Sequence, residues 1–302
     1  MTNIGNMYGP DFTFLGIPRC DLDKPESYKD ADVIIVGAPI DSGTSHRSGA
    51  KMGPQAIRMG DYLPHDASRP HLAMRIDPLQ KLKIYDAGDL LMPGGDLIKS
   101  LKVLEVATEK ISKAGAIAVV LGGDHSIASA DVTGIANHLG KGKVSMIHFD
   151  AHADTGENQF GALIGHGTPM RRLIESGAVR GDRFLQLGLR GYWPDDATLK
   201  WMAGKGMKSY EMTEIHHRGM KAVLDESFAI PATSADAIEW SPPNTTAIAP
   251  AFEIFSVATS KTLSELTKSP PDINKSPASK IFSFCSGSIR IARCGREASW
   301  GR

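Results

Sequence analysis

The chain has 302 residues, and its 34 basic and 34 acidic side chains give a formal net charge of +0. A neutral balance provides no electrostatic attraction to nucleic acid or to an acidic membrane surface, so neither is expected as a partner. The sequence contains no apolar run of about 18 residues or more, which excludes a predicted membrane-spanning helix.

The cysteines and the N-terminal segment indicate a cytoplasmic protein. Residues 1–6 lack both a basic start and an apolar stretch, so no secretory signal is expected. Cys20, Cys285 and Cys294 are widely spaced and form no CxxC motif. This usage fits a reducing compartment and argues against a disulfide scaffold or a cysteine zinc site.

Short apolar runs alternate with amphipathic segments from about residue 30 to 240. They predict strands at 32–37, 83–86, 116–121, 144–150, 183–189, 207–210 and 235–240. The predicted helices span 52–60, 95–114, 127–139, 168–177, 195–205 and 212–228. Because strands alternate with helices, we expect parallel βαβ units in an α/β fold, a three-layer α/β/α sandwich with a mainly parallel sheet.

The composition changes after about residue 240. Residues 241–302 are rich in Ser, Thr and Pro, including two Pro-Pro pairs, and show only weak periodicity. Polar stretches of this kind make poor cores. We therefore predict an α/β domain over 1–240 that is incomplete at its C-terminus, followed by a divergent, poorly ordered tail over 241–302.

The segment 146–155 contains Asp150, His152 and Asp154 at intervals of two residues. On an extended strand, side chains at this spacing share one face within about 7 Å. Carboxylates that follow an apolar run are costly to bury unless a cation neutralises them. Carboxylate together with imidazole favours Mn, Fe, Co, Ni or Zn over Ca or Mg.

A second polar motif follows the apolar run 116–121. The sequence Gly122-Gly123-Asp124-His125-Ser126 places Asp124 and His125 at the carboxyl end of the predicted strand. Ligands bind at that edge of open parallel sheets. The alternative is a strand-to-helix turn in which Asp124 or Ser126 caps the next helix. Together the two motifs predict a shared metal site.

Other histidines have more ordinary interpretations. His148 shares the ligand face by parity but lies deeper in its strand, so we interpret it as a hydrogen-bonded supporting or core residue. Asp124 is interpreted in the same way, as a residue that orients a ligand or caps a helix. His216 and His217 lie on a predicted helix with no partner acid nearby, which is typical of solvated surface.

With both motifs in place, the chain resembles the ureohydrolases, the family of arginases and agmatinases. The similarity covers about residues 10–240 and is closer to agmatinases and guanidinobutyrases than to arginases. Further segments that resemble the family are 37–45, 49–54, 85–89 and the histidine loop 166–169.

The resemblance implies a three-layer fold around a bridged pair of manganese ions. In the family, a metal-bound hydroxide attacks the guanidinium carbon and releases urea and an amine. By position, His125 and Asp154 would hold the first ion, His152 the second, and Asp150 both. His166 would be the catalytic proton shuttle near the leaving amine. The resemblance also implies a small guanidino substrate and a homo-oligomer, a trimer or hexamer.

The chain departs from the family at its third motif. The family has a Ser-x-Asp-x-Asp strand that supplies two further ligands, followed by an acidic Glu-Pro-Gly-Gly loop. Here Glu239-Trp240-Ser241-Pro242-Pro243-Asn244-Thr245 has neither aspartate, where they would be expected at about 243 and 245. Glu239 has the right parity but lies four residues short, about 13 Å of strand. We therefore predict a weak or empty second site and impaired catalysis, with a frameshifted, mis-spliced or degenerate C-terminus as the cause.

Several functions stay open at this stage. The leading prediction is agmatinase-like hydrolysis of a guanidino compound, with a guanidinobutyrase-like enzyme as a variant. A non-catalytic or truncated homologue with weak metal binding is the alternative from another class. A deacetylase-like metal hydrolase is less favoured by the two motifs. The loops 41–50 and 156–166 would read the substrate, and their lack of a basic pair beyond Arg47 favours a decarboxylated one.

Overall fold

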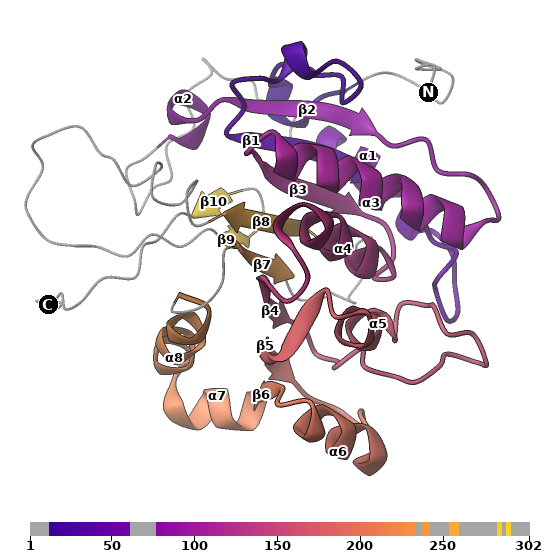
Figure 1. Ribbon diagram of the computed structural model, residues 1–302, viewed down its shortest axis with the longest axis vertical. Helices are drawn as coiled ribbons and strands as arrows, with labels where there is room; N and C mark the ends of the chain where they lie inside the picture. The colour runs from indigo at the N-terminus through magenta and orange to yellow at the C-terminus, as the bar shows by residue number, and fades with distance from the viewer. Residues whose placement is uncertain are drawn as a thin grey trace, which may run out of the picture.

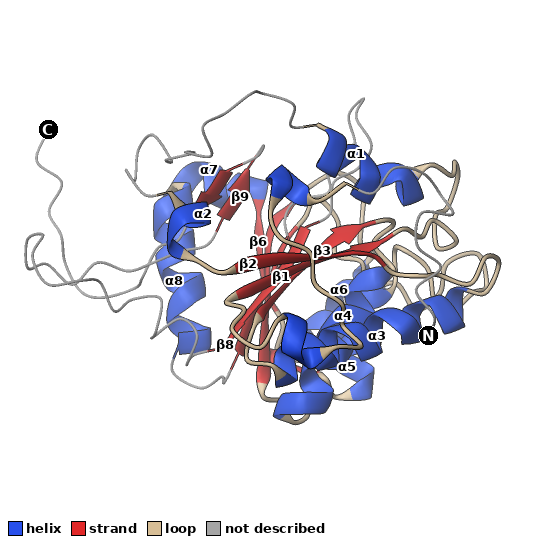
Figure 2. Ribbon diagram, turned by 90° about the horizontal axis from the view of Figure 1, so that it is seen from above, coloured by secondary structure: helices blue, strands red, loops and turns tan. Residues whose placement is uncertain are grey.

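The computed structural model describes residues 12–60, 77–232, 237–241, 254–259, 283–285 and 288–290, and from residue 228 on only their secondary structure. An eight-stranded sheet forms the centre, with helices on both of its faces (Figure 1). Viewed along the sheet, α8 lies on one side and α3, α4 and α5 on the other (Figure 2). This arrangement confirms the predicted three-layer α/β fold.

The sheet is parallel except for one strand. In spatial order its members are β2 (Ile84–Asp89), β1 (Val33–Ala38), β3 (Ile117–Gly122), β8 (Ile254–Thr259), β7 (Ala237–Ser241), β4 (Val144–Phe149), β5 (Val179–Leu189) and β6 (Lys208–Glu211). Only β8 runs antiparallel to its neighbours among these described strands. A separate antiparallel pair consists of β9 (Ser283–Cys285) and β10 (Ser288–Arg290).

The helices follow the strands along the chain. They are α1 (Gly53–Met59), α2 (Pro78–Lys81), α3 (Leu97–Lys113), α4 (Ile127–Leu139), α5 (Pro169–Ser176), α6 (Asp196–Gly204), α7 (Met212–Arg218) and α8 (Met220–Ala232). Short 3-10 turns lie at Phe14–Gly16, Pro25–Ser27 and Ala50–Met52.

Most predicted elements lie within a few residues of their observed positions, but the short elements α2, β9 and β10 were not predicted, and two larger differences concern the segment 212–228 and β8. The single helix expected over 212–228 is divided, because Gly219 adopts a φ of 82° that ends α7 before α8 begins. A left-handed φ of this kind is available to glycine at little steric cost. The strand β8 was not predicted, and it places six residues of the segment 241–302 within the main sheet. The division of the chain at residue 240 otherwise stays a prediction.

The core is densest between the sheet and the pair α3 and α4. Apolar residues of α3 at helical spacing, among them Leu104 and Ile111, are fully buried, and β1 and β3 are buried along their whole length. Burial of each such side chain contributes about 1.5–3 kcal/mol. Asp96 caps α3 by accepting a hydrogen bond from the backbone N–H of Lys99 at 3.0 Å. β3 and β4, which precede the two predicted site motifs, are therefore held in place by a densely packed core.

A buried ion pair attaches α1 to the sheet. The Arg58 guanidinium donates to both carboxylate oxygens of Asp86 at 2.9 Å, and it also contacts Asp89. Asp86 accepts two more hydrogen bonds at 2.8 Å, from the backbone N–H groups of Phe14 and Gly88. The charge of Asp86 is thus fully compensated inside the protein.

Within the described residues, no helix has both the length and the apolar character needed to cross a bilayer.

Candidate metal centre

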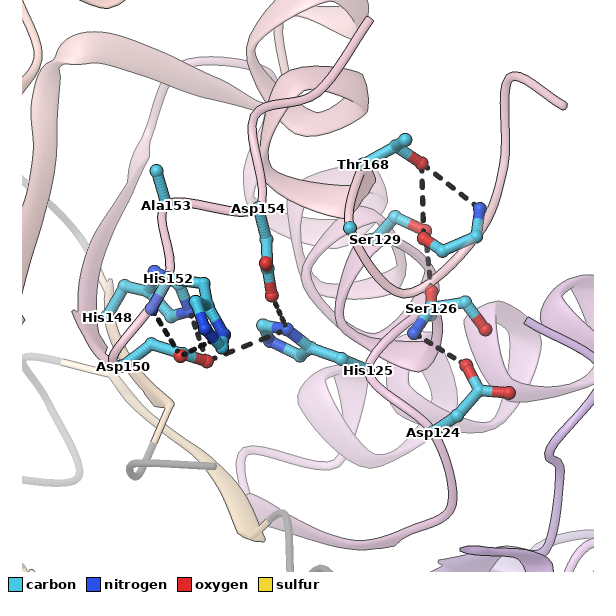
Figure 3. Close-up of polar contacts among 12 residues, drawn as sticks. Asp124, His125, Ser126, Ser129, His148, Asp150, His152, Ala153, Asp154 and Thr168 are labelled. Carbon is cyan, nitrogen blue, oxygen red and sulfur yellow. Dashed lines mark hydrogen bonds and ion pairs between the residues drawn. The ribbon is translucent and has the colours of Figure 1, made fainter. Parts of the chain in front are cut away.

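Two polar turns meet at the carboxyl edge of the sheet. One follows β3 and carries Asp124 and His125, and the other follows β4 and carries Asp150 and Asp154. Figure 3 shows His125 and Asp154 directed toward each other, with Asp150 and His148 beside them. The sheet therefore brings together residues about 25 positions apart at the edge where parallel α/β proteins bind ligands.

Four side chains form a compact cluster of potential ligands. His125, His148, Asp150 and Asp154 each offer one atom, and these atoms all lie within 4.8 Å of one another. Nδ1 of His125 lies 3.8 Å from Oδ2 of Asp150 and in direct contact with Oδ2 of Asp154. Two carboxylates in such a buried place need a cation. Imidazole and carboxylate together suit a single divalent transition-metal ion, so the described donor set fits one such ion.

The carboxyl group of Asp150 is held ionised. Burial by itself raises the pKa of Asp150, but the polar interactions with the neighbouring imidazoles of His148 and then His125 outweigh this effect. The backbone N–H of His152, which donates to Oδ1 at 2.8 Å, acts in the same direction. The resulting pKa is lowered to about 2, so Asp150 is a carboxylate at neutral pH and available as a ligand.

The arrangement of 150–154 differs from the extended strand assumed from its spacing. β4 ends at Phe149, and Asp154 has a left-handed φ of 48°. Aspartate is one of the few residues that tolerate this conformation. The turn directs Asp154 back toward His125, whereas the His152 side chain remains 47% exposed and outside the cluster. A turn beyond β4, and not the extended strand assumed from the spacing, therefore positions these side chains.

His152 nevertheless faces the cluster from its outer side. Its Nδ1 lies 3.9 Å from Oδ1 of Asp150, while Oδ2 of Asp150 faces His125. The two oxygens of Asp150 are thus directed at different histidines. Of the residues predicted as ligands, the structure gathers His125, Asp150 and Asp154 and leaves His152 at the rim.

Asp124 supports the site through backbone hydrogen bonds. Its carboxylate accepts from the N–H of Gly43 at 2.8 Å and from that of Ser126 at 2.9 Å. A Cβ at Gly43 would lie 2.6 Å from Oδ1 of Asp124, so only glycine permits this close approach. Asp124 thus braces the loop at Gly43 against the turn after β3 and is not a member of the ligand cluster.

His166 lies in a loop that is tied to the opposite wall of the site. Its backbone N–H donates to the carbonyl oxygen of Gly43 at 2.9 Å, and Nε2 of Gln159 donates to the same oxygen at 3.1 Å. These bonds join the loops 41–50 and 156–166, the two segments expected to read a substrate. The side chain of His166 is half-buried and is not a member of the ligand cluster. Its role as a proton shuttle stays a prediction.

Backbone register fixes the level of Glu239. In β7, Glu239 pairs with Met146 and Ser241 pairs with His148. Glu239 is therefore level with a residue four positions before Asp150, which is too deep in the sheet to replace a ligand at its edge. From residue 241 to 252 the sequence contains no Asp, Glu, His or Cys. The expected positions 243 and 245 lie outside the described residues.

Comparison with known proteins agrees with this geometry. The family model described as "Arginase family" matches residues 31–241. The chain belongs to the arginase family. The match ends where the third motif is absent from the sequence.

Relatives within the arginase family include several amidinohydrolases. Guanidinobutyrase of Pseudomonas aeruginosa is 32% identical over 222 residues, which cover 72% of this chain and 66% of that protein. The mitochondrial agmatinase of Gallus gallus is 35% identical over 175 residues, 57% of this chain and 50% of the relative. Among solved structures, proclavaminate amidino hydrolase of Streptomyces clavuligerus has a TM-score of 0.64 at 28% identity, covering 75% of this chain and 72% of that one. The chain thus spans about half to two thirds of the length of these curated relatives.

Proposed function

We propose that this arginase-family chain is an agmatinase-like, metal-dependent hydrolase of a guanidino compound, which releases urea and an amine at a reduced rate. The observation that carries the proposal is the cluster of buried His125 and Asp150 with the partly buried Asp154 at the carboxyl edge of the sheet. The names of the relatives, a guanidinobutyrase and an agmatinase, support the substrate class.

His125, Asp150 and Asp154 would hold one divalent ion, manganese by resemblance. When bound, such an ion lowers the pKa of a coordinated water and supplies hydroxide at neutral pH. Side chains of the protein would provide the electrostatic environment and the proton transfer. The carboxylates of Asp150 and Asp154 provide negative charge in a water-poor place, and His166 would carry a proton to the leaving amine. The joined loops 41–50 and 156–166 would enclose the substrate.

A second ion would find few ligands. Among the residues that the structure describes, the donors on this side are Oδ1 of Asp150 and Nδ1 of His152, and the side chain of His152 is 47% exposed. No acidic, histidine or cysteine residue lies between 241 and 252 to complete the set. We therefore propose that the second site is weak or empty, and this deficit is the reason for the reduced rate.

Metal analysis and urea release test the proposal together. The purified chain is dialysed with excess Mn²⁺ and then against buffer, and its ion content is measured by elemental mass spectrometry. Urea is measured with agmatine and with 4-guanidinobutyrate, and Asp150→Asn serves as the inactive control. The expected result is one retained ion per chain and slow urea release that Asp150→Asn abolishes. Two tightly retained ions with rapid turnover would contradict the proposed deficit.

A non-catalytic homologue is the second candidate, and the missing third motif favours it. In that case the chain would retain an ion but release no urea at any Mn²⁺ concentration. Activity on 4-guanidinobutyrate above that on agmatine would instead indicate the guanidinobutyrase-like variant.

The proposal also includes assembly of the chain as a trimer or hexamer. Analytical ultracentrifugation of the purified chain measures this oligomeric state.

A further inference from the structure

Three polar side chains lie at one level on neighbouring strands behind the ligand cluster. His148 in β4 pairs in register with Gln186 in β5, and Gln186 pairs with Ser209 in β6. His148 and Gln186 are fully buried, although their strands are otherwise apolar at this level. A buried glutamine within the run Phe184–Leu189 requires partners for its amide.

The amide of Gln186 has its orientation fixed by two neighbours. Its Nε2 lies 2.6 Å from the carbonyl oxygen of Ala153, which can only accept a hydrogen bond. Its Oε1 accepts from the hydroxyl of Ser209 at 3.3 Å. The reverse orientation would place two oxygen acceptors against each other at Ala153. The nitrogen therefore faces both Ala153 and His148.

The second amide hydrogen of Gln186 determines the tautomer of His148. Nε2 of Gln186 lies 3.1 Å from Nδ1 of His148, so this ring nitrogen is the acceptor. In a neutral imidazole the proton is then on Nε2. That nitrogen lies 3.4 Å from Oδ2 of Asp150, a carboxylate that only accepts. The 3.4 Å approach does not meet hydrogen-bond geometry, but the same neutral tautomer accepts from Gln186 and directs its N–H at the carboxylate.

The surrounding contacts leave His148 little freedom to turn. Its ring stacks on that of His125 with centroids 5.2 Å apart, and it meets the edge of Phe184 at 6.0 Å. The side chain is 0% exposed. The hydrogen bond from Gln186 to Ala153 also fixes the backbone of the 150–154 turn, so one glutamine contacts two neighbours of the metal-binding carboxylates.

We propose that Gln186 is a positioning residue, which holds His148 as the Nε2–H tautomer so that the N–H of His148 faces Asp150 and the ring does not itself bind metal. His148 is then excluded from the ligand set although its nitrogen lies within 4.8 Å of the other donor atoms. Oδ2 of Asp150 is kept in line with His125, and this leaves His125, Asp150 and Asp154 as the ligands of the inner ion. The inference rests on the proposed function only for the identity of these ligands.

Nitrogen NMR of histidine-labelled protein tests the tautomer directly. Spectra are recorded for the metal-free chain and after addition of Zn²⁺, a diamagnetic probe, and the His148 signals are assigned by their loss in His148→Gln. The expected result is an Nε2–H pattern for His148 in both states, with a shift of the His125 signals on Zn²⁺ binding. An Nδ1–H pattern in the metal-free chain, or loss of the Nε2 proton of His148 on Zn²⁺ binding, would overturn the proposal.

Substitution of Gln186 tests the positioning role. Gln186→Met keeps the shape but removes the donor, and we expect loss of the single-tautomer pattern and an approximately 10–100-fold weaker affinity for Zn²⁺. Gln80→Met makes the same chemical change at an exposed position and should leave both unchanged. Unchanged affinity in Gln186→Met would contradict the positioning role. If Gln186→Met does not fold by circular dichroism, the spectra of the unsubstituted chain still decide the tautomer.

The two proposals fail separately. A metal-free chain with the Nε2–H tautomer that binds no Zn²⁺ and releases no urea would refute the proposed function and the positioning role in metal binding, and leave the tautomer assignment standing. A chain that binds metal and releases urea with His148 coordinated through Nε2 would refute this inference alone.

Discussion

Nδ1 of His152 lies 3.9 Å from Oδ1 of Asp150, the oxygen that does not face His125. The two sides of this carboxylate have unequal surroundings. On the inner side are buried groups, His125 at 1% exposure and His148 at 0%. On the outer side the described ligand atom belongs to a half-exposed histidine. The inner side therefore has the more complete set of donors, and the outer side depends on ligands that the sequence does not supply.

This asymmetry predicts different effects for the two histidines that face Asp150. His125→Ala should weaken binding of the tightly held Mn²⁺ by at least the 10–100-fold that loss of an outer partner typically causes. His152→Ala should change the affinity for that ion by less than about threefold, because His152 contributes to the other side. Titration calorimetry with Mn²⁺ measures both.

His217→Ala is the matched control for these variants. His217 is exposed on α7 and the structure confirms its predicted place on the surface. Its substitution should leave Mn²⁺ binding unchanged. Equal losses in His125→Ala and His152→Ala would show that both histidines hold the same ion.

The sequence predicted the sheet and the main ligands because each depends on local pattern. Apolar runs that end in polar turns define β3 and β4, and parallel strands bring such ends to one edge. His125, Asp150 and Asp154 could thus be named before the structure was known. The exposure of His152 could not, since β4 ends at Phe149 and the chain leaves the strand before residue 152.

The buried pair of Arg58 and Asp86 is expected to control stability rather than chemistry. Asp86→Ala removes the bidentate partner of a guanidinium whose side chain is 4% exposed and leaves it only the contact with the more exposed Asp89. Breaking a buried pair in this way should lower the free energy of unfolding by about 3 kcal/mol. Urea denaturation followed by circular dichroism measures the change.

Arg180 and Asp182 provide the matched surface pair. Their side chains are 56% and 53% exposed, so solvent screens their attraction. Asp182→Ala should change the free energy of unfolding by no more than about 1 kcal/mol. If Asp86→Ala lowers the free energy of unfolding by only about 1 kcal/mol, the buried pair contributes no more to stability than a surface pair.

The thiol of Cys20 should be unreactive in the folded protein. Burial, and then the negative charge of Asp86, raise the pKa of Cys20 to about 12. At pH 8 the reactive thiolate would be roughly one part in 10,000, since reactivity follows the thiolate. Alkylation by iodoacetamide, followed by peptide mass mapping, should label Cys20 only after denaturation in guanidinium chloride.

The same shift has a defined effect on stability. The folded-state pKa of Cys20 lies above the value near 8.5 of an unfolded chain. The stabilisation of the folded state that comes from the neutral Cys20 thiol is therefore fully present below about pH 8.5 and is lost as the pH rises toward 12. Rapid labelling of Cys20 at pH 8 in the folded chain would contradict this account.

The role of Gln186 shows what residue patterns leave undetermined. A polar residue inside the apolar run of β5 was a visible signal, but its partners come from β4, β6 and the 150–154 turn. Hydrogen bonds between strands depend on register, and register was not available from the sequence alone. The same limit applies to β8, whose place between β3 and β7 is a long-range pairing.

Restoring the two missing acids should strengthen the second ion site. By resemblance to the family, the two missing aspartates are expected at about positions 243 and 245. The double variant Pro243→Asp and Thr245→Asp adds two carboxylates at the spacing of the family motif. We expect the affinity for a second Mn²⁺ to rise by at least about tenfold, together with faster urea release. A change of this size is typical when one residue around a metal site is altered. The variant Asn244→Asp with Thr246→Asp adds the same charge at positions that do not match the family motif and should gain neither. Equal metal content in the two variants would show that the missing acids are not what limits the second site.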